Sequence, residues 1–158
     1  MLAACLALAG CKRQAPEAEV AKEKAADLVS GFAMTDPQAA AQITHGFYSV
    51  ENGWRWVESK FGVTLAPPAG TSAQLELKFA VPAAVSDRLG AVTLSATVNG
   101  KALAPETYKT SGNQVYTRDL GVVGPGPVSV EFVSDKFLPP GNGDARELAL
   151  IVTRVGLK

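Results

Sequence analysis

Several stretches of this chain alternate apolar and polar residues with a period of two, which is typical of β-strands that bury one face. In SAQLELKFAV, residues 72–81, every second side chain from Leu75 onward is apolar. Residues 91–98 alternate in the same way and end at Asn99-Gly100, a dipeptide that strongly favours a hairpin turn. Further runs follow at 114–122, 126–134 and 146–157, with Gly and Pro residues between them. Strands at this spacing predict an all-β antiparallel sandwich.

The alternation also predicts which side chains form the core. Phe79 and Leu94 lie on the apolar faces of two of these strands, and we expect both to point into a common core. The chain has two cysteines, Cys5 and Cys11, and neither lies in the predicted sandwich. A disulfide or a Cys/His zinc site is therefore excluded there, and the domain depends on apolar burial alone.

The N-terminus has a different character. Residues 2–10 form an apolar run with the length of a signal-peptide core, too short to span a bilayer as a helix. The sequence Leu8-Ala9-Gly10-Cys11 resembles the lipobox of bacterial lipoprotein signal peptides. The resemblance implies cleavage before Cys11, acylation of its thiol by a palmitate-like chain, and anchoring at the cell envelope. Because Lys12 follows the cysteine in place of Asp, it also implies the outer rather than the inner membrane. The alternative is a buried apolar segment with an incidental cysteine.

The segment between this run and the strands is rich in Ala, Glu and Lys. Its spacing predicts a short, weakly amphipathic helix near 17–30, followed by a break at Asp36-Pro37. Because the apolar stripe is narrow, we favour a tether that holds the domain off the membrane over a helix packed on the domain. The expected organisation is a signal peptide at 1–10, a lipidated helical or flexible tether at 11–44, and a β-sandwich at 45–158.

Charge excludes some partners. The 158 residues include 15 Lys plus Arg and 15 Asp plus Glu, so the formal net charge is zero, and no basic run occurs. A nucleic-acid-binding protein normally shows a basic patch or stripe, so we expect no nucleic-acid partner. Contact with a membrane is expected through the lipid anchor alone.

The segment GFYSVENGWRW, residues 46–56, contains both tryptophans. If Glu51-Asn52-Gly53 forms a turn, residues 46–50 and 54–57 form two short strands. Trp54 and Trp56 then share one face, and Arg55 points the other way. The rings either bury a large area in the core or form a surface on which sugar rings stack. Among them, Tyr48 is the ring that we expect at the surface, because its hydroxyl tolerates water.

Four segments, in this order and spacing, resemble the accessory β-sandwich domain found beside many bacterial glycosyltransferases and in cell-surface polysaccharide proteins. They are GFYSVENGWRW (46–56), VNGKAL (98–103), FVSDKFLPP (132–140) and DARELALIV (144–152). The resemblance covers nearly the whole predicted domain. It implies a jelly-roll-like sandwich similar to carbohydrate-binding modules, in a glycan context and without a specified ligand.

We therefore expect a non-catalytic envelope lipoprotein whose sandwich contacts glycans, in the binding or assembly of surface polysaccharide. The alternative is a structural or protein-interaction lipoprotein with no glycan ligand. Exposure of the aromatic rings at 45–56 distinguishes the two.

Charged residues of the same segments allow two interpretations. In the first, the four charged residues Glu51, Arg55, Asp144 and Arg146 form a polar pocket for sugar hydroxyls. The ligand-binding residues expected on this basis are Tyr48, Trp54, Trp56, Glu51 and Arg55. In the second, which we favour, Glu51 or Asp144 forms a bidentate ion pair with an arginine that pins the two ends of the domain together. The structural ion pair expected on this basis is Asp144 with Arg146.

No catalytic set is specified. Glu51, Asp135 and Asp144 occur in turn-like contexts, with nothing to place two acids across a cleft, and no Ser/His/Asp order surrounds the single histidine, His45. Asp135, Asn142 and Asp144 offer oxygen ligands for calcium, but their spacing is not that of an EF-hand, and turn formation accounts for the loop. We expect no enzymatic activity, no metal and no cofactor.

Overall fold

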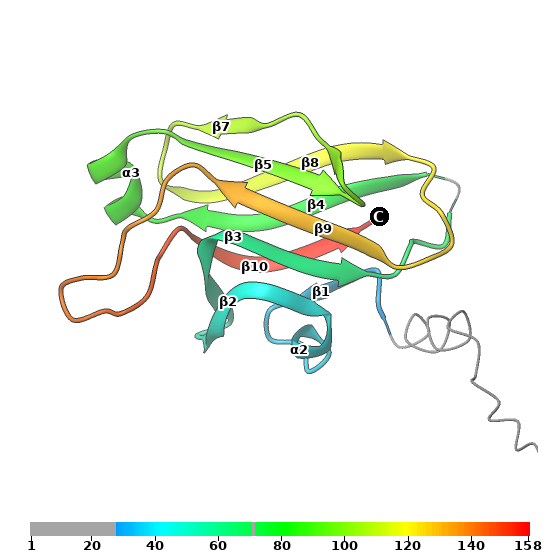
Figure 1. Cartoon of the computed structure of the whole chain (residues 1–158), viewed down its shortest axis with the longest axis horizontal. Helices are drawn as coiled ribbons and strands as arrows, with labels where there is room; N and C mark the ends of the chain where they lie inside the picture. The colour runs from blue at the N-terminus through cyan, green and yellow to red at the C-terminus, as the bar shows by residue number, and fades with distance from the viewer. Residues whose placement is uncertain (1–27, 71) are drawn as a thin grey trace, which may run out of the picture.

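The computed structural model of the chain describes residues 28–70 and 72–158 (Figure 1). The predicted signal peptide, Cys11 and most of the predicted helix near 17–30 lie outside the described residues. The strands are β1 (Gly31–Ala33), β2 (Ile43–Glu51), β3 (Trp54–Leu65), β4 (Ala73–Val81), β5 (Val92–Val98), β6 (Lys101–Ala102), β7 (Glu106–Tyr108), β8 (Gly112–Gly121), β9 (Val128–Ser134) and β10 (Leu150–Leu157), and the helices are α2 (Ala39–Gln42) and α3 (Ala83–Leu89). Neither of these two helices is long and apolar enough to cross a membrane.

All strand pairings in the described residues are antiparallel, in the order β6-β5-β9-β3-β10-β4-β8, with β1 on β10, β2 on β3 and β7 on β5. The sheet curls into two layers because β3 takes part in both. Residues 55–57 of β3 pair with β10, whereas residues 60–65 pair with β9. One layer thus contains β10, β4 and β8, and the other contains β9 and β5 (Figure 1). This confirms the predicted all-β, jelly-roll-like sandwich.

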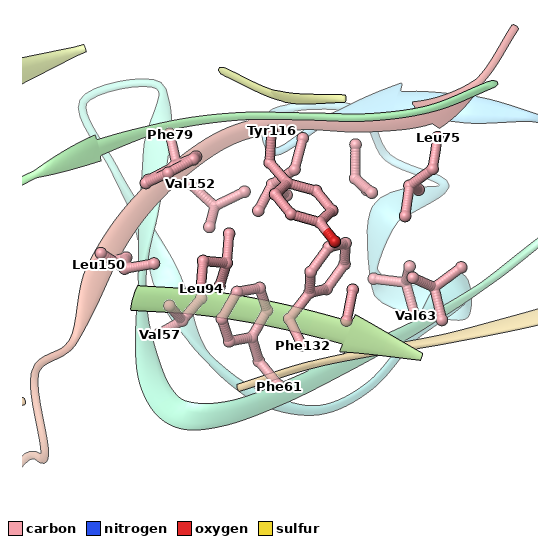
Figure 2. Close-up of a cluster of buried hydrophobic side chains, with 14 of the residues drawn as sticks. Val57, Phe61, Val63, Leu75, Phe79, Leu94, Tyr116, Phe132, Leu150 and Val152 are labelled. Atoms are coloured by element: carbon pink, nitrogen blue, oxygen red, sulfur yellow. The ribbon is translucent and has the colours of Figure 1, made fainter. Parts of the chain in front are cut away.

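The core fills the space between the layers. Figure 2 shows Phe79 and Tyr116 of one layer pointing toward Phe61 and Phe132 of the other. The Phe61 and Phe132 rings stack with centroids 5.1 Å apart, and Tyr116 meets Phe132 edge-on at 6.4 Å. The side chains of Phe79 and Leu94 are 2% and 0% exposed, which confirms the burial predicted for both.

Two hairpins are set by Asn-Gly turns. Asn52-Gly53 joins β2 to β3 with φ of 48° and 93°, and Asn99-Gly100 follows β5 with φ of 48° and 80°. Asn and Gly tolerate this left-handed region better than other residues, so the dipeptides fix where the strands reverse. β2 and β3 are 9 and 12 residues long, longer than the predicted 46–50 and 54–57, because β3 continues into the second layer.

The predicted tether at 11–44 ends too late, because the domain already includes the residues around 30. β1 pairs with the end of β10, and Phe32 and Met34 are 1% and 0% exposed. The buried Gln42 side chain bonds the backbone N–H and C=O of Val29 and the carbonyl of Thr64, at 2.9–3.0 Å. Residues 28–30 are not helical, and the expected boundary at 44/45 is therefore wrong.

The seven-residue helix α3 was not predicted either. It follows Pro82 at the end of β4 and places Val85, 0% exposed, in the core. A helix this short shows too little of its period to be distinguished from a loop by sequence.

Truncation of a buried side chain from either layer should destabilise the protein. We expect Phe32→Ala and Leu94→Ala each to cost about 2–5 kcal/mol in the free energy of unfolding, because each leaves a cavity. Denaturant unfolding measures this cost, with Val122→Ala as the control because Val122 is 83% exposed. A near-neutral Phe32→Ala would contradict the assignment of β1 to the domain.

Candidate functional site

The β2–β3 hairpin places both tryptophans on the outer surface of the sandwich. Val57 of β3 is fully buried, so the alternation of the strand turns Trp54, Trp56 and Glu58 away from the core. Both indoles are half-buried, and their centroids lie 6.0 Å apart with an interplanar angle of 83°. The two rings are thus nearly perpendicular, in an edge-to-face arrangement.

A small hairpin in the loop before β10 brings Asp144 and Arg146 to the same end of the molecule. Bridges join Leu138 to Leu148 and Gly141 to Asp144, and Asn142 turns with a φ of 51°. This loop extends beyond the ends of the strands in Figure 1, on the side of the β2–β3 turn.

Arg146 is the centre of a polar cluster. Its guanidinium donates to both carboxylate oxygens of Asp144, at 3.0 and 2.9 Å, and to Glu51 Oε1 at 2.6 Å. It also lies over the ring of Tyr48, 5.4 Å from the centroid. Glu51 pairs with Trp54 across the hairpin, so the arginine ties this hairpin to the loop before β10. Asp144 and Arg146 therefore form an ion pair, with Glu51 as a further partner.

The charges of this cluster stabilise one another. Hydrogen bonds from the side chain and the backbone N–H of Arg146 lower the pKa of Asp144. Hydrogen bonds to Asp144 and then to Glu51 raise the pKa of Arg146 above its already high value. Asp144 and Arg146 are therefore ionised at neutral pH and act as fixed charges.

Tyr48 is half-buried and is held at its hydroxyl, rather than being a free surface ring. The hydroxyl accepts a hydrogen bond from the Glu147 backbone N–H at 3.1 Å and donates to Glu58 Oε1 at 3.4 Å. Burial is the main cause that raises the pKa of Tyr48, and the Glu58 charge adds to it. The Glu147 carboxylate in turn accepts from the Ser59 backbone N–H at 2.6 Å.

Arg55 does not lie with the tryptophans. It points to the other side of β3, where Nε donates to the Met34 carbonyl at 3.3 Å and Nη1 to the Tyr48 carbonyl at 3.0 Å. These bonds hold the segment after β1 against β2. The Arg55 side chain thus bonds to backbone carbonyls and is separate from the surface of the candidate site.

His45 also lies elsewhere. Its Nε2 is 3.0 Å from Glu131, across the intervening strand at Gly62. A Cβ at Gly62 would come within 2.7 Å of both side chains, so the glycine leaves room for this exposed pair.

Sequence reasoning missed Glu58 and Glu147 as members of the cluster. Glu58 has the same strand alternation as Trp54 and Trp56, which was a usable signal. Glu147 meets Tyr48 over a separation of 99 residues, and no local pattern indicates that contact.

The cluster suits binding better than metal ligation. Within residues 28–70 and 72–158, no three His, Cys, Asp or Glu side chains are grouped as metal ligands. Asp135 accepts from the Thr93 backbone N–H at 2.6 Å, and both oxygens of Asp144 are bonded to Arg146. What remains is an indole pair beside carboxyl groups and a guanidinium, which can bind a ligand with apolar faces and hydroxyl groups.

No protein-family model and no curated protein matches the chain. Solved structures are similar in fold. One is an exo-β-1,3-galactanase from Phanerochaete chrysosporium with β-1,3-galactotriose, at 15% identity and a TM-score of 0.51, covering 83% of this chain and 29% of that one. Another is an acetyl xylan esterase from the rumen bacterium Butyrivibrio proteoclasticus, at 13% identity and a TM-score of 0.50, covering 82% and 32%.

The chain thus spans about a third of these two proteins, at 29% and 32%. A carbohydrate-binding module (CBM36) in complex with calcium and xylotriose matches over 82% of this chain and 100% of its own, at 9% identity and a TM-score of 0.48. At such identities the likeness concerns the fold alone.

The contribution of the Asp144–Arg146 ion pair to stability should be measurable as a loss of unfolding free energy at acidic pH. Because the pKa of folded Asp144 is lowered, its contribution to stability is complete above the unfolded value of about 3.9 and is lost as the pH falls through the folded value. The difference in unfolding free energy between wild type and Asp144→Asn should be constant from about pH 7 to 5 and shrink below about pH 4. Carboxyl NMR titration of Arg146→Gln should show the Asp144 pKa returning toward its usual range. An unchanged pKa in that variant would contradict the pairing.

Proposed function

We propose that this protein is a non-catalytic, glycan-binding lipoprotein of the cell envelope. The observation that supports glycan binding is the indole pair of Trp54 and Trp56, partly exposed on the outer surface beside the Glu51–Arg146 ion pair. Sugar rings have apolar C–H faces that stack on indoles, and their hydroxyls bond to charged side chains.

The position of the tryptophans favours binding over packing. Indoles bury large areas when they stabilise a core, yet neither of these is among the buried residues of this sandwich. The next outward positions of the same strand are the polar, exposed residues Glu58 and Lys60, so this face of β3 does not require apolar side chains. Partly exposed indoles on the outward face of a strand leave apolar ring surface accessible to a ligand.

The fold and the sequence resemblance point the same way. The two enzymes that share the fold over part of their length are named for glycan substrates. The segments at 46–56 and 144–152, which resemble accessory domains beside glycosyltransferases, meet in the structure through Glu51 and Arg146.

The absence of catalysis is part of the proposal. The Glu51 and Asp144 carboxylates are both paired with Arg146, and the pKa of Asp144 is lowered. A general acid needs a carboxyl group whose pKa is raised instead.

Loss of one indole should weaken glycan binding without unfolding the protein. We expect Trp56→Ala to lose about 1–3 kcal/mol of binding free energy, as truncation of a central contact residue does. The effect should depend little on salt, because no charge is removed. A glycan array with the wild-type chain identifies ligands, and calorimetry then compares the variants.

Trp56→Phe, which keeps a ring, and Val133→Ala on the other layer serve as controls for this measurement. If no glycan binds to the wild-type chain, the alternative of a structural or protein-interaction lipoprotein takes the place of this proposal.

The anchor is the second part of the proposal, and it depends on the sequence 8–11 alone. We expect Cys11→Ala to abolish acylation and to leave an uncleaved or soluble form. Mass spectrometry of the N-terminal peptide and membrane fractionation measure the two effects, with Cys5→Ala as the matched control. A wild-type chain without lipid would contradict the anchor, and its fractionation between inner and outer membranes tests the proposed outer-membrane location.

A further inference from the structure

The surface that bears Trp56 continues across three more strands. Trp56 on β3 pairs with Ile151 on β10, Ile151 with Ala80 on β4, and Ala80 with Asn113 on β8. Paired residues of antiparallel strands project from the same side of the sheet. Phe79, next to Ala80, points into the core, so this row points outward. With strands about 4.8 Å apart, the row extends about 14 Å from Trp56 to Asn113.

A shallow hollow of about 360 Å³ lies beside the far end of this row. It is lined by Lys78, Phe79, Asn113, Gln114, Val115 and Thr153. Lys78 pairs with Val115, which is 47% exposed, and Thr153 is also exposed. The row thus leads from an indole, over small and branched apolar side chains, to a hollow with amide, hydroxyl and ammonium groups.

Cations exceed acids around the hollow. Glu76 lies 2.5 Å from Lys158 and 3.8 Å from Lys78, and Arg154 is the register partner of Lys78 on β10. Bonding to Lys158, followed by the charges of Lys78 and Arg154, lowers the pKa of Glu76. One carboxylate therefore faces three cations. The next acid along β8, Asp119, accepts a hydrogen bond from Gln74 at 2.8 Å.

At the opposite end of the row, near the tryptophans, acidic side chains outnumber the cations that pair with them. Glu51 and Asp144 share the single cation Arg146, and Glu58 lies beside Tyr48. An anionic group is therefore disfavoured near the tryptophans and favoured near Lys78 and Arg154.

We propose that this surface binds an acidic glycan laid across the strands. Its sugar rings lie on Trp56 and Ile151, and a sugar carboxylate lies beside Lys78 and Arg154. The inference rests on the proposed glycan-binding function and adds the charge class of the ligand, its direction and a second contact region. Exposed cations bind carboxylates by charge-assisted hydrogen bonds, which screening by salt weakens.

The test compares matched ligands. The full-length chain, purified in detergent, is titrated with oligomannuronate, oligogalacturonate and oligoglucuronate, and with each oligomer after its carboxyl groups are reduced to alcohols. We expect at least one acidic oligomer to bind about tenfold more tightly than its reduced form, a factor that corresponds to ~1.4 kcal/mol. This preference should fall as salt is added.

Two double variants locate the charge effect. Lys78→Gln with Arg154→Gln should remove the preference for the acidic oligomer and leave binding of the reduced form unchanged. Lys101→Gln with Lys109→Gln removes the same charge from exposed positions on β6 and after β7, and should change neither. Trp56→Ala should weaken the binding of both the acidic and the reduced oligomer. Backbone amide shifts on binding are expected at Ile151, Ala80 and Asn113.

The outcomes separate the two proposals. If acidic and reduced oligomers bind equally, or the two double variants behave alike, the acidic-ligand inference is overturned while glycan binding stands. If no acidic or neutral glycan binds, both proposals fall. Shifts confined to the loop before β10 would overturn the path across the strands.

Discussion

The continuity of β3 through both layers is the constraint on which the rest of the molecule depends. Its inward side chains, among them Val57, Phe61 and Val63, are fully buried and join the two layers. Because side chains alternate along a strand, burial of this set forces Trp54 and Trp56 onto the outer surface. A shift of one residue in register would exchange the two sets. The core and the candidate site are therefore opposite sides of one strand.

Arg146 organises the polar side of the same region. It neutralises carboxylates from the β2–β3 hairpin and from the loop before β10, and it lies over the Tyr48 ring. Exposed ion pairs contribute little to stability one by one, but a forked arginine with two acids orients the groups that it joins. The position of the aromatic surface thus depends on contacts between segments about a hundred residues apart, such as the 95 residues between Glu51 and Arg146.

The sequence predicted what local patterns determine. Alternation located the long strands and the burial of Phe79 and Leu94, and Asn-Gly dipeptides located two turns. The alternation also predicted that Arg55 points away from the tryptophans, which the structure confirms. The expected group of ligand-binding residues nevertheless included Arg55, which the structure places apart from the others on the other side of β3. The three-residue β1 was missed because it is too short to show a period, and its place is set by β10 far along the chain. Contacts such as Glu147 with Tyr48 depend on tertiary structure and have no local signal.

The pairing of β10 has a mechanical consequence. Near its start, Ile151 pairs with Trp56 of β3, and near its end, Gly156 pairs with Gly31 of β1. The five residue steps from Ile151 to Gly156 span about 17 Å along the strand. If the chain is anchored through the residues before 28 and binds a glycan at Trp56, tension between the glycan and the membrane passes along β10, parallel to the strands. The hydrogen bonds between β1 and β10 then resist in shear, sharing the force, instead of opening one after another.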